Sequence, residues 1–165
     1  MASRVARLFP TLLACALAAV AGCGQGGPSQ GVAQTAAPSE PTSRDFGEFQ
    51  LHYNAVRTDV LTADVARAYG IARSANRVLL NVSLLRKNAD GTTTPVDGAV
   101  TATAYNLNGQ LKELAMRRIT EGTSVYYIGE VGISGNEILV FDINAVPPDQ
   151  ETKLSVQFKR EFFAG

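Results

Sequence analysis

The single histidine of the chain, His52, is the natural candidate for acid–base chemistry, because histidine changes its charge near neutral pH. A serine nucleophile that depends on an activating histidine would have to use this residue. The region that we expect to fold, residues 45–165, has no Gly-x-Ser-x-Gly motif, which would place a serine on a tight turn. A lone histidine is more typical of a surface or hydrogen-bonded position. We therefore expect a non-catalytic protein, and an enzyme that uses His52 or an acidic residue is the less favoured alternative.

Metal-ligating residues are equally few. Zinc and copper sites need several nitrogen or sulfur ligands, and the same region offers one histidine and one methionine, Met116, so we expect no metal and no cofactor. Oxygen ligands that could suit calcium gather at Asn88, Asp90, Thr92 and Asp97, but their spacing differs from that of an EF-hand loop. A solvated turn is the simpler interpretation. Residues 45–165 also lack a phosphate-binding glycine loop and a dinucleotide-binding fingerprint.

Cysteine chemistry is predicted at one position, Cys23. Arg4 and Arg7 precede an apolar run of about 14 residues, shorter than the roughly 20 that span a bilayer, as in an export signal. The run ends in Val20-Ala21-Gly22-Cys23, which resembles the bacterial lipobox, whose cysteine thiol accepts a diacylglycerol. We predict that residues 1–22 are a cleaved lipoprotein signal peptide and that lipidated Cys23 anchors the protein to a membrane. The alternative is an ordinary secretory signal that contains a cysteine by chance.

The neighbours and charges of this signal define the expected location. Gly24 follows the cysteine, where an aspartate would favour the inner membrane, so we expect the periplasmic face of the outer membrane. Cys15 would be removed with the signal, which leaves no free thiol and no disulfide in the domain. Loss of Arg4 and Arg7 changes 15 basic and 15 acidic side chains to 13 and 15, a net charge of −2. Without a basic patch we expect no nucleic acid partner, and membrane attachment through the lipid alone.

The rest of the chain divides into a linker and one domain. Residues 24–44 are mostly Gly, Gln, Pro, Ser, Ala and Thr, a composition typical of a flexible linker. In residues 45–165 apolar and polar residues alternate, which predicts β-strands. The clearest alternation is near the end, where Leu154, Val156 and Phe158 would face a core. The predicted strands span 49–55, 78–85, 100–107, 111–119, 124–131, 137–146 and 153–163.

One short helix interrupts the predicted strands. Thr62 is a suitable N-cap, Ala63 to Tyr69 form the helical turns, and Gly70 ends them. Turn residues such as Asn108-Gly109 separate the strands and favour antiparallel pairing. About seven short antiparallel strands favour an all-β, immunoglobulin-like sandwich over a closed barrel.

Two stretches together resemble a known bacterial family. The first is Leu51-His52-Tyr53-Asn54-Ala55, followed by Leu61-Thr62, and the second runs from Ala68-Tyr69-Gly70-Ile71 through Asn76-Arg77-Val78 to Ser83. These residues resemble domain of unknown function 4426, and the similarity extends over nearly all of residues 45–163. The resemblance implies an exported, all-β, immunoglobulin-like domain. It implies no activity, cofactor or site residue.

A candidate binding surface follows from polar residues that a sandwich core does not need. It comprises His52, Asn54, Tyr69, Arg73, Asn76 and Arg77. Loops held on a rigid scaffold often carry binding residues, and arginine is enriched at interfaces. The structural alternative is that Arg73 and Arg77 bridge acids such as Asp59 or Asp64 and fasten the helix to a sheet.

Three classes of function remain after these exclusions. We favour an envelope-anchored lipoprotein with a non-catalytic module that binds or assists another envelope protein. The second class is a module that binds a small ligand or a cell-wall glycan, for which tyrosines could supply stacking surfaces. These tyrosines are Tyr53, Tyr69, Tyr126 and Tyr127. The third class is an enzyme.

Overall fold

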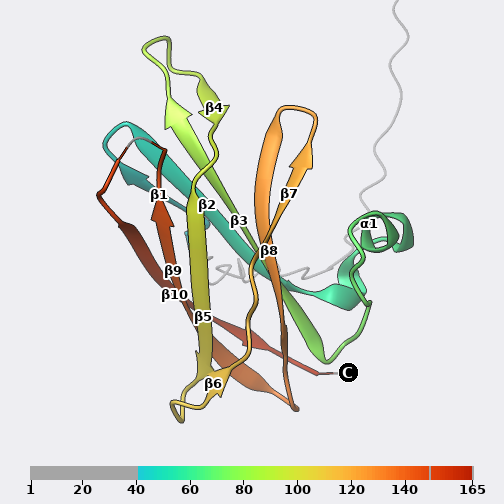
Figure 1. Cartoon of the computed structure of the whole chain (residues 1–165). Coiled ribbons are helices and arrows are strands. Elements are labelled where there is room, and N and C mark those ends of the chain that lie inside the picture. Colours follow the sequence, from blue (N-terminus) through green and yellow to red (C-terminus); the bar gives the residue numbers. More distant parts are fainter. Residues whose placement is uncertain (1–40, 149, 165) are drawn as a thin grey trace, which may run out of the picture. The chain divides into compact units, whose positions relative to one another are not determined.

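The computed structural model describes residues 41–148 and 150–164, which fold into two antiparallel sheets (Figure 1). The first sheet has the order β1-β2-β3-β8-β7, and β4 also pairs with β3. The second sheet has the order β10-β9-β5-β6. The first sheet contains β1 (Ser43–Phe46), β2 (Phe49–Arg57), β3 (Arg77–Lys87), β4 (Thr93–Pro95), β7 (Arg117–Glu121) and β8 (Ser124–Gly132). The second contains β5 (Ala99–Asn106), β6 (Leu111–Lys112), β9 (Glu137–Val146) and β10 (Leu154–Phe162).

The two sheets pack as an open sandwich, which confirms the predicted fold class. Leu154, Val156 and Phe158 of β10 are buried, and the residues between them are exposed, as the alternation predicts. The ring of Phe158 lies 4.9 Å from that of Tyr53 on the first sheet and 5.0 Å from that of Phe141 on β9. The contact of Phe158 with Tyr53 joins the two sheets through the core, and its contact with Phe141 lies within the second sheet.

The structure has more strands than the sequence predicts. The short strands β1 and β4 were not expected, and β1 begins at Ser43, inside the predicted linker. The single strand predicted for residues 111–119 is instead two strands in different sheets, β6 and β7. The intervening residues cross the edge of the sandwich, where Met116 and Leu114 pack over Gly129. Alternation alone does not show which sheet a strand joins.

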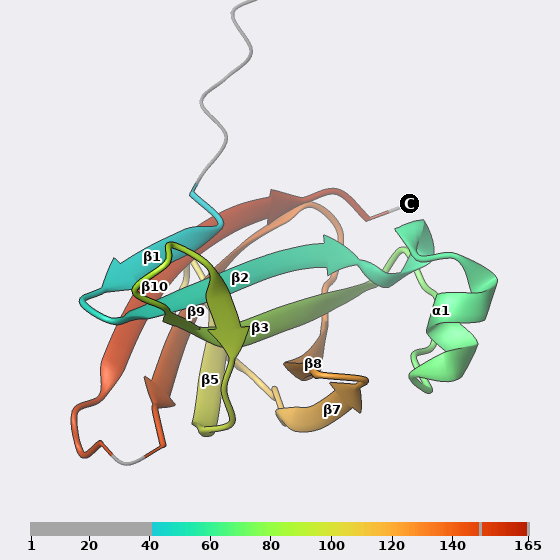
Figure 2. The same cartoon turned by 90° about the horizontal axis from the view of Figure 1, so that it is seen from above.

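The predicted helix is present as α1 (Ala63–Ala68), one residue shorter than expected, after a 3₁₀ turn at Thr58–Val60. The Thr62 hydroxyl accepts a hydrogen bond from Val65 N at 3.3 Å, so Thr62 is the N-cap as predicted. Gly70 has a φ of +61°, the left-handed conformation that ends many helices. Figure 2 shows α1 at one end of β2 and β3. Among the described residues, no helix is long and apolar enough to span a membrane.

The buried hydroxyl of Thr58 fixes the chain that follows α1. It donates a hydrogen bond to Ala72 O at 2.8 Å and accepts one from Ser74 N at 2.9 Å. These bonds fold residues 72–74 back against the 3₁₀ turn. We call residues 58–71, which include the 3₁₀ turn and α1, the helical segment.

Candidate binding surface

The outer face of the first sheet carries the residues of interest. The strand register places Asn54, Asn81, Ile128 and Arg117 side by side in one row across β2, β3, β8 and β7. Side chains alternate between the two faces of a strand, so every second residue on either side of this row shares its face. The outer face therefore also includes His52, Leu79, Ser83, Ile119, Glu121 and Tyr126.

The helical segment covers part of this face with apolar side chains. Ala66 and Ile71 pack with Leu79 of β3 and Ile128 of β8, and all four are buried. Leu61, Tyr69, Ile119 and Tyr126 surround them and are partly buried. This second hydrophobic cluster lies outside the main core and attaches the helical segment to the sheet.

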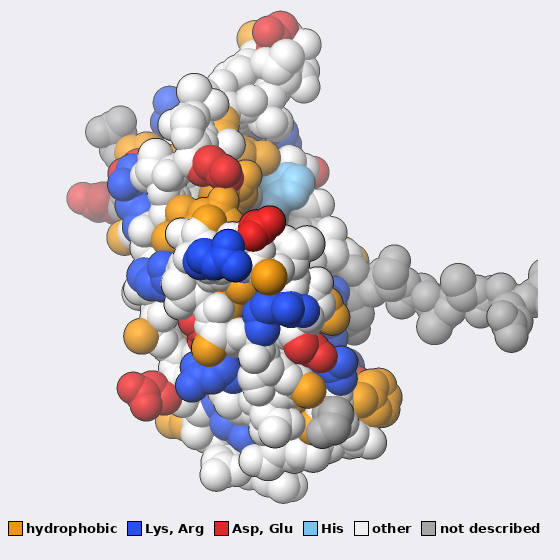
Figure 3. Space-filling model, turned by 90° about the vertical axis from the view of Figure 1, so that its right-hand side faces the viewer, with side chains coloured by type: hydrophobic (Ala, Val, Ile, Leu, Met, Phe, Trp, Pro, Cys, Tyr) orange, Lys and Arg blue, Asp and Glu red, His pale blue; other side chains and the backbone are white. Residues whose placement is uncertain are grey.

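A groove of about 340 Å³ remains between the helical segment and the sheet. Its wall on the sheet side consists of Leu79, Asn81, Ile119, Glu121, Tyr126 and Ile128, and the other wall consists of Leu61, Val65, Tyr69 and Ile71. Figure 3 looks onto this side of the molecule, where exposed hydrophobic side chains lie between acidic and basic ones. A mostly apolar groove with a few polar groups is typical of a binding site.

The polar groups in and beside the groove differ in whether they have hydrogen-bond partners. The side-chain oxygen of Asn81 is buried and accepts no hydrogen bond from the described residues. The Glu121 carboxylate accepts one from the Tyr69 hydroxyl at 2.6 Å, and this bond raises the pKa of Tyr69. The Arg117 guanidinium donates to the Tyr69 carbonyl oxygen. Asn81 is thus an acceptor in need of a donor, since unpaired buried polar groups are costly.

His52 and Asn54 lie in a smaller polar depression next to the groove. Its lining includes Thr42, His52, Asn54, Asn81 and Ser83, so Asn81 borders both hollows. His52 Nε2 hydrogen-bonds Gln50 Oε1 at 2.7 Å, and the Asn54 side-chain oxygen accepts a bond from Arg160 at 2.5 Å. Both predicted site residues therefore already have partners within the domain.

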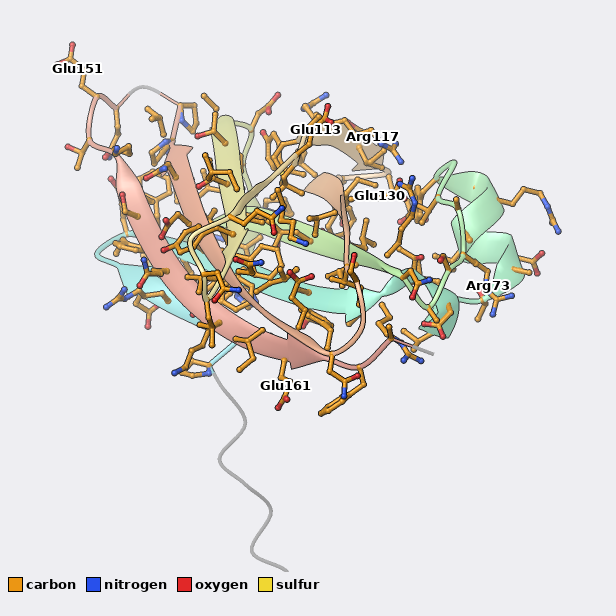
Figure 4. The ribbon with its side chains drawn as sticks, turned by 90° about the horizontal axis from the view of Figure 1, so that it is seen from below. Arg73, Glu113, Arg117, Glu130, Glu151 and Glu161 are labelled. Carbon is orange, nitrogen blue, oxygen red and sulfur yellow. The ribbon has the colours of Figure 1, made fainter. Side chains whose placement is uncertain are left out.

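The six residues of the predicted surface do not form one site. Tyr69 alone lines the groove, and Arg77 pairs with Glu130 at 3.4 Å in a more polar hollow beside it. Asn76 contributes its carbonyl oxygen to a bond from Ile133 N. Figure 4 shows Arg73 next to the helical segment, and its guanidinium donates to the backbone oxygen of Asp59 at 2.8 Å.

The acids suggested as partners for these arginines are bound to others. The Asp59 carboxylate pairs with Arg57 at 2.8 Å, and that of Asp64 pairs with Arg67 at 2.9 Å. Arg73 nevertheless fastens the loop after α1 to the 3₁₀ turn, through a main-chain oxygen.

Sequence reasoning missed Asn81, Ile119 and Glu121 as groove residues. The one available signal was Asn81, a polar residue near the middle of a mostly apolar strand. Of the four tyrosines proposed for stacking, Tyr53 and Tyr127 are buried in the core, whereas Tyr69 and Tyr126 line the groove.

In the turn that could suit calcium, the polar side chains form hydrogen bonds within the turn. Asn88 Nδ2 donates to the Thr92 and Thr94 hydroxyls, and Asp90 accepts from Thr92 N at 2.9 Å. Asp97 is engaged elsewhere, with Tyr127 and Arg118. Within residues 41–148 and 150–164, no three or more His, Cys, Asp or Glu side chains lie close enough to hold a metal ion.

The fold and the groove define an antiparallel β-sandwich domain with a partly covered outer sheet face. The chain belongs to the family described as domain of unknown function DUF4426, whose model matches residues 43–165. No curated protein matches the sequence significantly.

Solved structures agree with this assignment. A DUF4426 family protein of Pseudomonas aeruginosa, PA0388, has 31% sequence identity and a TM-score of 0.63, with 74% of this chain and 94% of that chain covered. FetP of uropathogenic Escherichia coli has 14% identity and a TM-score of 0.52, with 73% and 92% covered. A copper-bound variant of FetP has 15% identity and a TM-score of 0.50, with 73% and 93% covered. The likeness to FetP concerns the fold alone.

Proposed function

We propose that this protein is an envelope lipoprotein, anchored through Cys23, whose domain binds another envelope protein without catalysing a reaction. The signal peptide (1–22), Cys23 and nearly all of the linker (24–44) lie outside the described residues, so the proposal of an anchor depends on the sequence motif. FetP, which shares the fold, was produced in the periplasm. The same compartment would suit a domain that follows an export signal.

The groove between the helical segment and β7 and β8 carries the proposal of binding. Its walls are mostly apolar and contain one buried oxygen without a donor, at Asn81. The opening does not stabilise the sandwich itself, because side chains that filled it would bury more apolar surface. A partner side chain inserted there would gain that burial.

A site-specific cross-linking experiment tests this function. A photoreactive phenylalanine analogue at Val65, which lines the groove and is 40% exposed, should link in living cells to one discrete envelope protein. The same analogue at Leu107, which is 66% exposed and lies away from the groove, is the control and should not. Adding Ile119→Trp to the Val65 reporter should fill the groove and remove the product. Identical products at both positions, or none at Val65, would contradict the proposal.

A second candidate function is the binding of a small ligand or a cell-wall glycan. The observation in its favour is that Tyr69 and Tyr126 both line the groove, where rings can stack on sugars. Saturable binding of soluble cell-wall fragments to the full chain, lost in Tyr126→Ala, would favour it. The absence of such binding, with the Val65 cross-link present, would favour a protein partner.

A further inference from the structure

Strand β7 forms an open edge of the first sheet, beside the groove. It is the last strand in the order β1-β2-β3-β8-β7, and among the described residues it pairs only with β8. In an antiparallel ladder, alternate residues turn their N–H and C=O groups away from the neighbour. Figure 1 shows no further strand beyond β7. Such an edge can accept an added strand from another protein.

The other edge strands are less suitable for strand addition. Strands β1, β4 and β6 have four, three and two residues. Strand β10 has nine, but Arg160 and Arg57 tie it to β2, through bonds to Ala55 O and Phe163 O. Strand β7 is therefore the edge that combines sufficient length with a hollow next to it.

The outer face of β7 presents a basic, an apolar and an acidic side chain at alternate positions. These are Arg117, Ile119 and Glu121, and Ile119 lines the groove. At about 3.3 Å per residue, the two charged residues are separated by about 13 Å along the strand. Neither forms an ion pair with another described residue. Their other contacts are with Tyr69, which carries no charge.

We infer that the groove and the edge together bind one extended segment of the partner protein, added to β7 as a further strand. Cross-strand neighbours on one face attract when their charges are opposite. The segment therefore carries an acidic residue opposite Arg117, a large apolar residue opposite Ile119 and a basic residue opposite Glu121. The apolar side chain enters the groove. This inference rests on the proposed function, since it names the chemistry of the partner.

Defined peptides test the inference on the full chain purified in detergent. The probes are fluorescent nine-residue peptides that contain Glu-Thr-Phe-Thr-Lys or its reverse, Lys-Thr-Phe-Thr-Glu, because a strand can add in either direction. Fluorescence anisotropy should show saturable binding of at least one. Replacing Phe by Ala in that peptide should weaken binding by about tenfold or more, the effect of losing one buried aromatic side chain.

A charge exchange tests the predicted pairing of charges, whereas the preference between the two mixed-charge peptides gives the strand orientation. A peptide containing Glu-Thr-Phe-Thr-Glu should bind the wild-type chain more weakly than the mixed-charge peptide does. It should bind the Glu121→Lys variant more tightly than it binds the wild type, because the introduced ammonium group would lie opposite the second glutamate. Glu121 is exposed at the end of β7, so its side chain can be exchanged without changing the core. Equal affinities for all the peptides, or no saturable binding up to about 1 mM, the weak end of specific binding, would overturn the inference.

The cross-linking and peptide-binding experiments test the proposed function and the strand addition separately. A Val65 cross-link without peptide binding would retain the proposed function and reject strand addition at β7. Peptide binding that follows the charge pattern, without a cross-link in cells, would instead retain the site and contradict the proposal of an envelope protein partner.

Discussion

The guanidinium of Arg160 on β10 donates a hydrogen bond to the carbonyl oxygen of Ala55 on β2, at 2.6 Å. The same nitrogen, Nη1, reaches the Asn54 side-chain oxygen at 2.5 Å. The two strands belong to different sheets, so this arginine joins the sheets along an open side of the sandwich. A main-chain oxygen that would otherwise lack a strand partner is thereby satisfied.

Replacing this arginine should weaken the sandwich. We expect Arg160→Met to lower the free energy of unfolding by about 1–3 kcal/mol, because hydrogen bonds from a charged donor are lost. Lys159→Met, on the exposed side of the same strand, should change it by less than about 0.5 kcal/mol. Urea unfolding measures both. Equal effects of the two variants would show that Arg160 does not join the sheets.

A side chain at Gly129 should disturb the packing of the segment between β6 and β7, because its Cβ atom would lie 3.2 Å from the backbone oxygen of Ala115 in that segment. A Cβ atom there would lie 2.7 Å from Met116 Sδ and 2.8 Å from Leu114 Cδ1, in the segment that crosses between the sheets. We expect Gly129→Ala to destabilise the domain by about 1–3 kcal/mol, the usual cost of overpacking. Gly132→Ala is a matched control on the same strand, where a Cβ would meet no atom within 4 Å. A thermal melt with both variants near the wild type would contradict this packing.

Acid should destabilise the domain partly through Asp97. The hydrogen bond from the Tyr127 hydroxyl, followed by Arg118, holds the pKa of Asp97 below its ordinary value. A carboxyl whose pKa is lower in the folded state adds stability above its unfolded pKa, near 4, and loses it as the pH falls through the folded pKa. The stability attributed to Asp97 should therefore begin to decrease near pH 4 and be lost once the pH is below the folded pKa of Asp97.

Tyr127→Phe isolates this contribution. At pH 7 the variant should lose about 1–3 kcal/mol, because the buried hydroxyl donates a hydrogen bond to Asp97 and accepts one from Gly98 N. The difference in stability between wild type and variant should shrink as the pH falls from about 4 through the folded pKa of Asp97, since Asp97 becomes protonated in both. Denaturant unfolding at several pH values measures it. A difference that does not change with pH would exclude Asp97 as its origin.

The lipid anchor is testable by metabolic labelling. Cys23→Ser should abolish incorporation of labelled palmitate and leave unprocessed precursor, because the serine oxygen does not replace the thiol that accepts the lipid. Cys15→Ser should label normally, since this residue lies within the predicted signal. Equal labelling of Cys23→Ser and the wild type would disprove the lipoprotein assignment.

Local sequence patterns predicted the longer strands and the helix, but neither the short strands β1 and β4 nor the assembly of the sheets. Alternation at Leu154, Val156 and Phe158 predicted β10, and the capping role of Thr62 followed from its position before an apolar turn. Both depend on neighbours within a few residues. The division of residues 111–119 between two sheets brings Leu114 and Met116 against Gly129, which lies on another strand and at least 13 residues from either of them.

The groove shows the same limit. Its walls combine Val65, Leu79 and Ile119, which only the strand order and the position of α1 bring together. His52 and Arg73 stood out because their types suit chemistry, yet both are bonded within the domain. Ile119 did not stand out, because an isoleucine in an alternating strand is expected to be part of a core.

The pairing of β3 with β8 also determines when this domain can fold. Arg77 pairs with Gly132, which is more than fifty positions later in the chain, so the centre of the first sheet cannot form until β8 is available. Domains dominated by such distant pairings fold in milliseconds to seconds rather than microseconds. A chain that crosses a membrane with its N-terminus first, as the export signal predicts, would still lack its central strand pair during most of the passage. The domain would then remain unfolded, as passage through a narrow channel requires, until β8 has emerged.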